Sequence, residues 1–283
     1  MRALRAVSQG WIAIVVLMVA GGVSLQGQQA QQAQQVKTFQ PEVGQSGKDV
    51  VWVPTPQVLV DKMLDMAEVT PSDYVIDLGS GDGRTVITAA KRGARALGIE
   101  YNPDMVELSA ANAAKEGVGS RAKFMNADLF ETDFSQATVV TMFLLPDINL
   151  KLRPKILEMK PGTRIVSNSF SMGDWEADAT YTVEEGCTSW CTALFWIVPA
   201  KVEGKWRLGS GELTLTQEFQ MLQGTLASNG KSLPISEARM RGDQITFSAG
   251  GAVYTGRLKA GTMAGNAQNG GSQTTWSAVR ADK

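Results

Sequence analysis

The sequence has no histidine among its 283 residues and only two cysteines. The absence of histidine excludes Ser-His and Cys-His catalytic pairs, and it excludes zinc sites built on imidazole ligands. Two cysteines are too few for a small domain stabilised by disulfides or for a four-thiolate metal site. The sequence therefore predicts no metal centre.

An excess of charge of one sign is also lacking, because 27 Lys and Arg residues balance 28 Asp and Glu residues. Non-specific binding to nucleic acid needs a large excess of basic residues, so we expect no nucleic-acid partner. The composition, 43% hydrophobic and 19% charged, is typical of globular proteins. The length allows one ordinary domain and a smaller second one.

The N-terminal hydrophobic run is short, with 15 residues from 11 to 25, whereas a membrane-spanning helix needs about 20. Arg2 and Arg5 precede it and small residues follow, which is the pattern of a secretory signal. We expect residues 1–25 to be a signal peptide or a membrane anchor, and the protein to be exported (periplasmic) or anchored through this segment. Residues 26–49 begin with a glutamine-rich stretch and are assigned to a flexible linker.

Residues 50–202 show an alternation of predicted strands and helices. Short apolar runs bounded by glycine or proline indicate buried strands, and apolar residues at helical spacing indicate helices. The predicted helices are 57–69, 84–92, 103–116 and 148–157, and the predicted strands are 74–78, 96–100, 122–126, 138–145, 164–169 and 194–198. This order predicts an α/β fold with a Rossmann-like, doubly wound, mostly parallel sheet.

A glycine-rich turn with Gly79, Gly81 and Gly83 follows the first predicted strand. Glycines permit a tight turn and a close approach to a ligand, and the following helix directs its positive N-terminus there. The spacing differs from the G-x-G-x-x-G of nicotinamide-binding proteins, and the Gly-Lys-Ser/Thr of phosphate loops is absent. Asp77 would repel a pyrophosphate, so the turn favours a ligand with a cationic amino group.

Two further acids end the next two predicted strands. Glu100 stands where an acceptor can bind both hydroxyls of a ribose. Asp128 follows the third strand, where a carboxylate can accept from the amine of an adenine. Glu100 could also be an ordinary exposed glutamate at a strand end, and Asp128 could be a simple aspartate in a turn. Together with Asp77 they predict a pocket for an adenosine that carries an amino-acid tail.

This set of residues resembles the class I S-adenosylmethionine-dependent methyltransferases. A closer likeness is to the small lysine methyltransferases of mitochondria and their bacterial relatives, which modify the ATP synthase c-subunit and the adenine nucleotide translocase. It is carried by the segments 52–56 (WVPTP), 77–84 (DLGSGDGR) and 143–146 (FLLP). The resemblance implies S-adenosylmethionine as cofactor and a protein lysine as acceptor, and it allows a membrane-associated acceptor protein.

The resemblance also implies site residues. The site for the methyl donor, S-adenosylmethionine, would comprise Thr55, Asp77, Gly79, Ser80, Gly81, Asp82, Gly83, Glu100, Tyr101, Asp128 and Leu129. The acceptor slot would comprise Phe143, Pro146 and Asp147, although simple core packing also accounts for the apolar residues. Methyltransferases that act on planar nitrogens carry Asn/Asp-Pro-Pro-aromatic at the end of the fourth strand. This chain has Phe-Leu-Leu-Pro-Asp there, which disfavours adenine and glutamine amides as acceptors. Methylation of a small molecule or lipid, and nucleotide binding without catalysis, remain alternatives.

The remaining features lie in the last third of the chain. Cys187 and Cys191 lie just before the strand 194–198, and either a local disulfide or two reduced cysteines fits their spacing. Residues 203–283 contain short β-like runs separated by glycine turns. They predict a small antiparallel β meander or barrel. This second domain contains no cluster of titratable residues, so we interpret it as an interaction or stabilising module.

Overall fold

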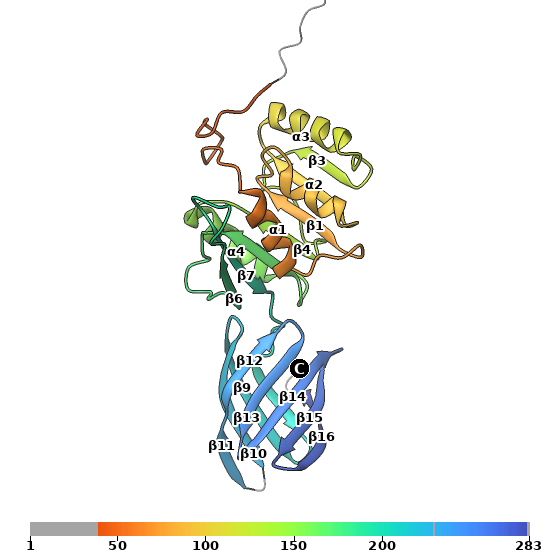
Figure 1. Cartoon of the computed structure of the whole chain (residues 1–283). Helices are drawn as coiled ribbons and strands as arrows, with labels where there is room; N and C mark the ends of the chain where they lie inside the picture. Colours follow the sequence, from red (N-terminus) through yellow and green to blue (C-terminus); the bar gives the residue numbers. More distant parts are fainter. Residues whose placement is uncertain (1–38, 229, 282–283) are drawn as a thin grey trace, which may run out of the picture. The chain divides into compact units, whose positions relative to one another are not determined.

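The computed structural model describes residues 39–228 and 230–281, and its first sheet has seven strands in the order β3-β2-β1-β4-β5-β7-β6 (Figure 1). The strands are β1 Tyr74–Leu78, β2 Arg95–Glu100, β3 Ala122–Asn126, β4 Val139–Met142, β5 Arg164–Asn168, β6 Ala179–Thr182 and β7 Thr192–Ile197. β1 to β5 pair in parallel, and β7 is antiparallel to β5 and β6. The predicted Rossmann-like, mostly parallel sheet is confirmed.

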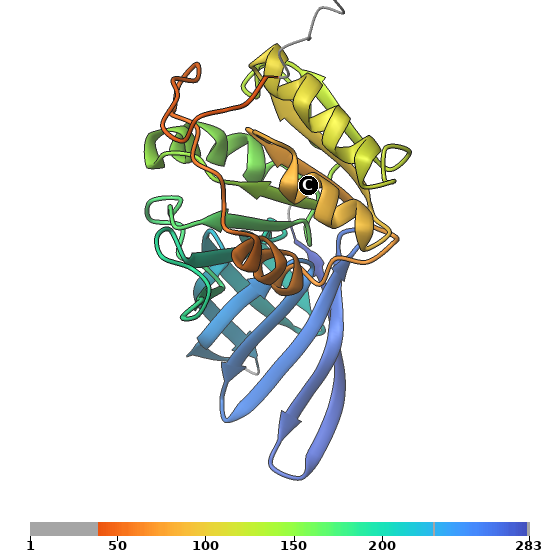
Figure 2. The same cartoon turned by 45° about the horizontal axis from the view of Figure 1, so that its top comes forward.

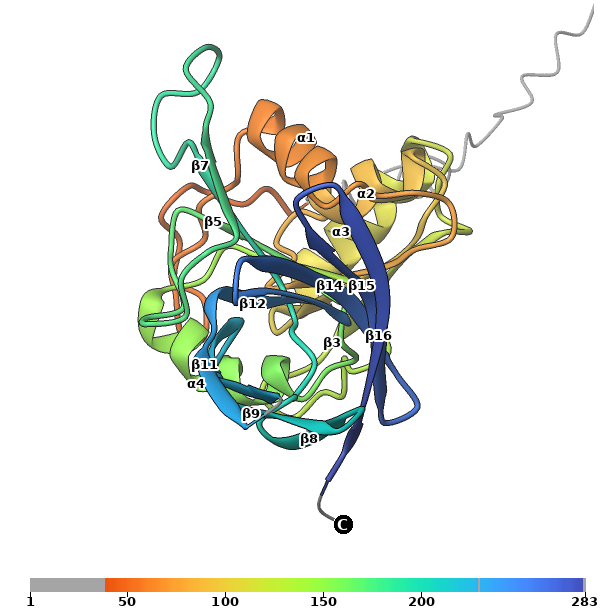
Figure 3. The same cartoon turned by 90° about the horizontal axis from the view of Figure 1, so that it is seen from below.

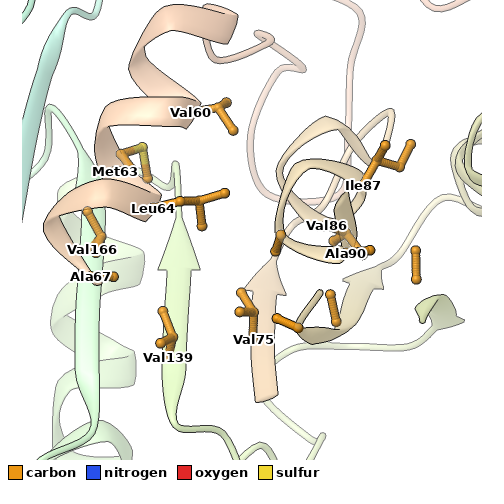
Figure 4. Packing of buried hydrophobic residues seen from close by; sticks show 14 of the residues in the cluster. Val60, Met63, Leu64, Ala67, Val75, Val86, Ile87, Ala90, Val139 and Val166 are labelled. Atoms are coloured by element: carbon orange, nitrogen blue, oxygen red, sulfur yellow. The ribbon is translucent and has the colours of Figure 1, made fainter. Parts of the chain in front are cut away.

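Four helices pack on this sheet: α1 Gln57–Met66, α2 Arg84–Lys91, α3 Pro103–Lys115 and α4 Pro146–Leu157. α1 and α2 bury aliphatic side chains such as Leu64 and Val86 against Val75 and Val139 of the strands (Figure 4). Ile148 of α4 belongs to a second buried cluster. The parallel strands are thus covered by apolar residues, as the apolar runs of the sequence require.

The second sheet has nine antiparallel strands in the order β11-β10-β12-β13-β14-β15-β16-β8-β9. They are β8 Gly204–Leu208, β9 Gly211–Glu218, β10 Met221–Ser228, β11 Lys231–Pro234, β12 Ser236–Arg241, β13 Gln244–Ala249, β14 Ala252–Lys259, β15 Thr262–Asn269 and β16 Ser272–Arg280. β9 also pairs with β10, which closes the sheet into the ring seen in Figure 3. Alternate side chains, among them Trp206, Phe247 and Met263, fill one apolar core, so the predicted small antiparallel domain is confirmed as a barrel. The domain boundary that we propose near residue 202 falls between β7 and β8.

The expectation of an exported or membrane-anchored protein needs correction. Within residues 39–228 and 230–281, the structure contains no helix with the length and apolar character needed to cross a bilayer. Residues 1–25, from which the expectation came, and residues 26–38 of the predicted linker lie outside the described part. The described end of the linker, from residue 39, leads into the extended segment that precedes α1 (Figure 2).

A buried ion pair joins the turn before β1 to β5. Asp73 is 6% exposed and pairs with the guanidinium of Arg164. It also accepts hydrogen bonds from the backbone N–H of Thr70 (2.8 Å) and the hydroxyl of Thr138 (2.7 Å). Burial by itself would raise the pKa of Asp73, but the hydrogen bonds and Arg164 hold it below its ordinary value.

We expect Arg164→Ala to lower the free energy of unfolding at pH 7 by about 3 kcal/mol, because it leaves a buried carboxylate without its cation. The depressed pKa of Asp73 means that this stabilisation exists above the unfolded-state pKa, about 4, and is lost as the pH falls further. Urea denaturation of both proteins at pH 7 and pH 3 measures the effect. Arg92→Ala is the matched control, because its partner Asp65 is exposed and the expected loss is below about 1 kcal/mol. Equal losses for the two variants would contradict the assignment.

Candidate functional site

A cavity lies where the carboxyl ends of the parallel strands meet, which is the ligand-binding edge of such sheets. Of the predicted site residues, those that line it are Thr55, Asp77, Gly79, Ser80, Gly81, Asp82, Glu100, Tyr101, Asp128, Leu129 and Phe143. The three strand-end acids therefore face one common cavity. Gly83, Pro146 and Asp147 are not among its lining residues.

The glycine turn needs the conformational freedom of its residues. Gly79 and Gly81 have φ angles of 75° and 54°, a region that other L-residues rarely adopt. A Cβ on Gly81 would lie 2.6 Å from the indole nitrogen of Trp52, which reaches over the turn from the segment before α1. The turn therefore presents bare backbone to the cavity. Gly83 has another role, since a Cβ there would lie 2.8 Å from the ring of Phe124.

Asp77 is buried at the end of β1, with 6% of its surface exposed. Its Oδ1 accepts a hydrogen bond of 2.7 Å from the hydroxyl of Thr141. Burial, with smaller contributions from the nearby charges of Glu100 and Asp82, raises its pKa to about 7, although the hydrogen bond from Thr141 opposes the shift. A buried carboxylate without a cation is unfavourable, so the site is suited to a ligand that brings a positive charge.

Glu100 ends β2 and is fixed by two backbone donors. Its Oε2 accepts from the N–H of Gly81 (2.9 Å) and its Oε1 accepts from the N–H of Asn102 (3.0 Å). The first bond ties the carboxylate to the glycine turn, and each oxygen keeps a lone pair free to accept from a ligand hydroxyl. The arrangement thus provides an oriented acceptor next to the turn.

Asp128 follows β3 and pairs with Lys48, whose ammonium lies 2.5 Å from Oδ2. The hydrogen bond from Lys48, followed by that from the backbone N–H of Phe130, lowers the pKa of Asp128, and the same contact with Asp128 raises the pKa of Lys48. The Lys48 ammonium also lies 5.0 Å from the centroid of the exposed ring of Tyr101. Lys48 belongs to residues 45–49, which the sequence assigned to the linker but which line the cavity.

Two other residues predicted for the methyl-donor site, Asp82 and Thr55, already have hydrogen-bond partners within the protein. Asp82 forms a bidentate pair with Arg84, with contacts of 3.0 and 2.6 Å. Arg84 also donates to the backbone carbonyl of Thr55 (2.8 Å). Within residues 39–228 and 230–281 the buried hydroxyl of Ser80 has no hydrogen-bond partner, and a Cβ on Gly98 would lie 2.4 Å from it. Ser80 therefore fills space against β2.

The residues after β4 form an apolar part of the lining, as expected for Phe143. Leu144, Leu145 and Ile148 line the cavity beside it. Pro146 and Asp147 are exposed in the first turn of α4, because the chain enters the helix at Pro146 and turns these side chains away from the lining.

The lining residues that were not predicted as site residues include Lys48, Trp52, Phe170 and Trp190. Trp52 stands in the segment that carries the family resemblance, which was the signal available in the sequence. Lys48, Phe170 and Trp190 lie in irregular segments without a motif. A disulfide joins Cys187 to Cys191, on either side of Trp190. Of the two alternatives that the sequence left open, a local disulfide and two reduced cysteines, the structure has the disulfide.

The acids and the glycine turn of the cavity are chemically suited to an adenosine that carries a cationic amino-acid tail. The carboxylates of Asp77, Glu100 and Asp128 face one cavity. They lie beside the glycine turn, where a Cβ added to Gly81 would clash with Trp52. A dinucleotide or triphosphate would instead bring negative charge next to these acids.

Comparisons with known proteins find methyltransferases that are similar to this chain. The profile described as the ANTKMT methyltransferase domain matches residues 77–179. A protein-lysine N-methyltransferase of Saccharolobus islandicus is 46% identical over 140 residues, which cover 48% of this chain and 87% of that enzyme. The lysine N-methyltransferase of the ATP synthase c-subunit from Homo sapiens is 41% identical over 105 residues, 37% of this chain and 45% of the human enzyme.

A solved structure is similar to part of this chain. It is described as an RNA methyltransferase from Salinibacter ruber in complex with S-adenosyl-L-homocysteine, and it is 47% identical to this chain with a TM-score of 0.50. The match covers 53% of this chain and 96% of that one. The similarity therefore extends over nearly the whole of the solved enzyme and over about half of this chain.

Proposed function

The chain belongs to the S-adenosylmethionine-dependent protein-lysine N-methyltransferase family, and we propose that it methylates the ε-amino group of a lysine in a protein acceptor. The observation that carries the proposal is the single cavity in which Asp77, Glu100 and Asp128 meet an apolar lining that includes Phe143 and Leu144. The acids suit the donor, and the apolar residues suit a lysine side chain.

On the donor side, we propose that Asp77 receives the ammonium of the methionine tail, Glu100 the ribose hydroxyls and Asp128 the adenine amine. The backbone of the glycine turn would lie against the tail between them. Thr55, Ser80, Asp82, Tyr101 and Leu129 would shape this site, with Asp82 held by Arg84. The cofactor supplies a methyl group on a sulfonium, which makes that carbon electrophilic.

On the acceptor side, Phe143 and its neighbours after β4 would surround the lysine with apolar groups. Desolvation lowers the pKa of an amine, so the slot favours the neutral, nucleophilic form. The lysine would first lose its ammonium proton to water; its nitrogen would then use the lone pair for the new N–C bond as the S–C bond of the donor breaks, which leaves a charged methylammonium. In-line positioning is the main requirement of such a transfer, and Phe143 is the residue that we assign to it.

The charge of the cavity favours lysine over RNA as the acceptor. The acidic lining residues are Asp49, Asp77, Asp82, Glu100 and Asp128, and the basic ones are Lys48 and Arg84. Both basic residues are paired with acids of the lining. The excess of acid attracts a cationic lysine and repels phosphates. RNA remains the competing acceptor because of the name given to the Salinibacter ruber enzyme.

The proposal is tested by incubating the full chain with methyl-labelled S-adenosylmethionine and a cell extract, followed by protease or ribonuclease treatment. We expect label that is sensitive to protease and, after acid hydrolysis, is found in methylated lysine. Asp77→Ala is the negative control. Label that is removed by ribonuclease, or that is found in lipid or small molecules, would contradict a lysine acceptor. The membrane association suggested by the resemblance concerns the acceptor's location and is not needed for this outcome.

A further inference from the structure

Three aromatic rings from separate segments meet at the cavity. Phe143 follows β4, Phe170 follows β5, and Trp190 lies between β6 and β7. The ring centroids are 5.9 Å apart for Phe143 and Phe170, 6.0 Å for Phe143 and Trp190, and 5.1 Å for Phe170 and Trp190. All three line the cavity that contains Asp77. We call these three rings the aromatic wall.

The conformation of Trp190 is not explained by packing of the core. The residue is 45% exposed, and large apolar side chains gain stability when they are buried instead. Its φ angle is 57°, a backbone region that bulky residues rarely adopt. An exposed indole on such a backbone, beside a cavity, points to a role in binding.

The Cys187–Cys191 disulfide restrains this residue. The bond closes a loop with a sequence separation of four residues, and Trp190 directly precedes Cys191. The restraint therefore acts next to the indole and limits how far the ring can move from Phe143 and Phe170.

The wall suits the two chemical parts of a lysine side chain. Aromatic faces attract cations and form the cages that bind methylated ammonium groups, and they also pack against methylene stems. Methylation of the amine preserves the positive charge, so the wall would bind the acceptor lysine and its methylated products alike. A phosphate or a nucleobase edge offers no such cation.

We propose that the aromatic wall binds the acceptor's lysine side chain, and that the Cys187–Cys191 disulfide positions Trp190 for this contact. The inference rests on the proposed function, because it assigns the substrate contact of the same site. Trp190 is thereby a specificity-determining residue for the acceptor, whereas the donor is held by the acids at the strand ends.

The test uses free Nε-trimethyllysine as the probe and the full, oxidised chain saturated with S-adenosylhomocysteine. NMR titration of the trimethylammonium signal measures the dissociation constant. We expect Trp190→Gly to weaken binding by about tenfold, and Trp190→Phe by less, because phenylalanine keeps an aromatic face. Glycine suits the positive φ, so this variant keeps the loop backbone. The affinity for S-adenosylhomocysteine should stay within about twofold.

Tyr181→Ala is the matched control, because Tyr181 is 46% exposed and is not among the lining residues. It should leave trimethyllysine binding unchanged. The double variant Cys187→Ser/Cys191→Ser, and the wild type reduced with a phosphine, should both weaken trimethyllysine binding and leave the donor product bound. Reduction adds two electrons and two protons, converts the disulfide to two thiols and oxidises the phosphine to its oxide.

Two results would overturn binding of the lysine by the aromatic wall: no binding of trimethyllysine to the wild type, or equal affinity in Trp190→Gly. Equal affinity in the double serine variant would overturn the positioning role of the disulfide. Failure of the proposed function gives a different pattern, in which trimethyllysine still binds at the wall but no label reaches protein lysine.

Discussion

Replacing Asp77 with asparagine is expected to abolish donor binding and, at pH 8, to make the ligand-free protein more stable. The buried carboxylate of Asp77 has its pKa raised to about 7, so at pH 8 the wild type carries a buried charge that no cation of the described residues pairs with. Asparagine keeps the shape and can still accept from Thr141, but it has no charge to bury. In the variant, the ammonium of S-adenosylmethionine would no longer have the Asp77 carboxylate to pair with.

The sign of the pH dependence follows from linkage. Between the unfolded-state pKa, about 4, and the folded-state value, about 7, the native protein binds more protons than the unfolded chain. Stability of the wild type therefore falls as the pH rises through this window. At one pKa unit per 1.4 kcal/mol, the gain in Asp77→Asn is at most about 4 kcal/mol at pH 8. It should disappear near pH 4.

Thermal unfolding of wild type and Asp77→Asn at pH 5 and pH 8, with and without S-adenosylhomocysteine, measures both effects. The ligand should raise the melting temperature of the wild type alone. Asp128→Asn is the matched control, because the pKa of Asp128 is lowered, chiefly by the hydrogen bond from Lys48. Its replacement should weaken the binding of S-adenosylhomocysteine without stabilising the protein. A variant at position 77 that binds the donor as the wild type does would contradict the assignment.

Replacing Glu100 with glutamine is expected to weaken donor binding by about a hundredfold, the upper range for the loss of a hydrogen bond to a charged group. Both carboxylate oxygens of Glu100 accept from backbone N–H groups, those of Gly81 and Asn102. A glutamine presents an amide NH2 to one of these two donors, so the glycine turn loses a contact and the ribose loses an anionic acceptor.

Titration calorimetry with S-adenosylhomocysteine measures this effect. Glu107→Gln is the control, since Glu107 is exposed on α3 and should bind as the wild type does. If Glu100→Gln kept wild-type affinity while its fold was intact, Glu100 would have no part in the donor site.

That the three acids share one cavity could be predicted, because their positions follow from local pattern and topology. Asp77, Glu100 and Asp128 lie at or just after the ends of three consecutive predicted strands, and parallel strands bring their carboxyl ends to one edge. The glycine turn was equally predictable, since positive φ and close packing at Gly79 and Gly81 require the absence of a side chain.

Other parts of the site depend on contacts that no local pattern encodes. Lys48 reaches Asp128 across 80 positions of the chain, and Trp190 reaches Phe143 from a loop between two antiparallel strands. β6 was missed because all four of its residues are exposed and it therefore lacks an apolar period. The strand predicted over 138–145 ends at Met142, because the residues after it leave the sheet to line the cavity.

The central claim is that this cavity binds S-adenosylmethionine, and titration calorimetry with that compound and the full wild-type chain at pH 8 tests it most directly. We predict saturable binding at one site per chain. An absence of binding heat up to millimolar ligand, at more than one temperature, would contradict the account.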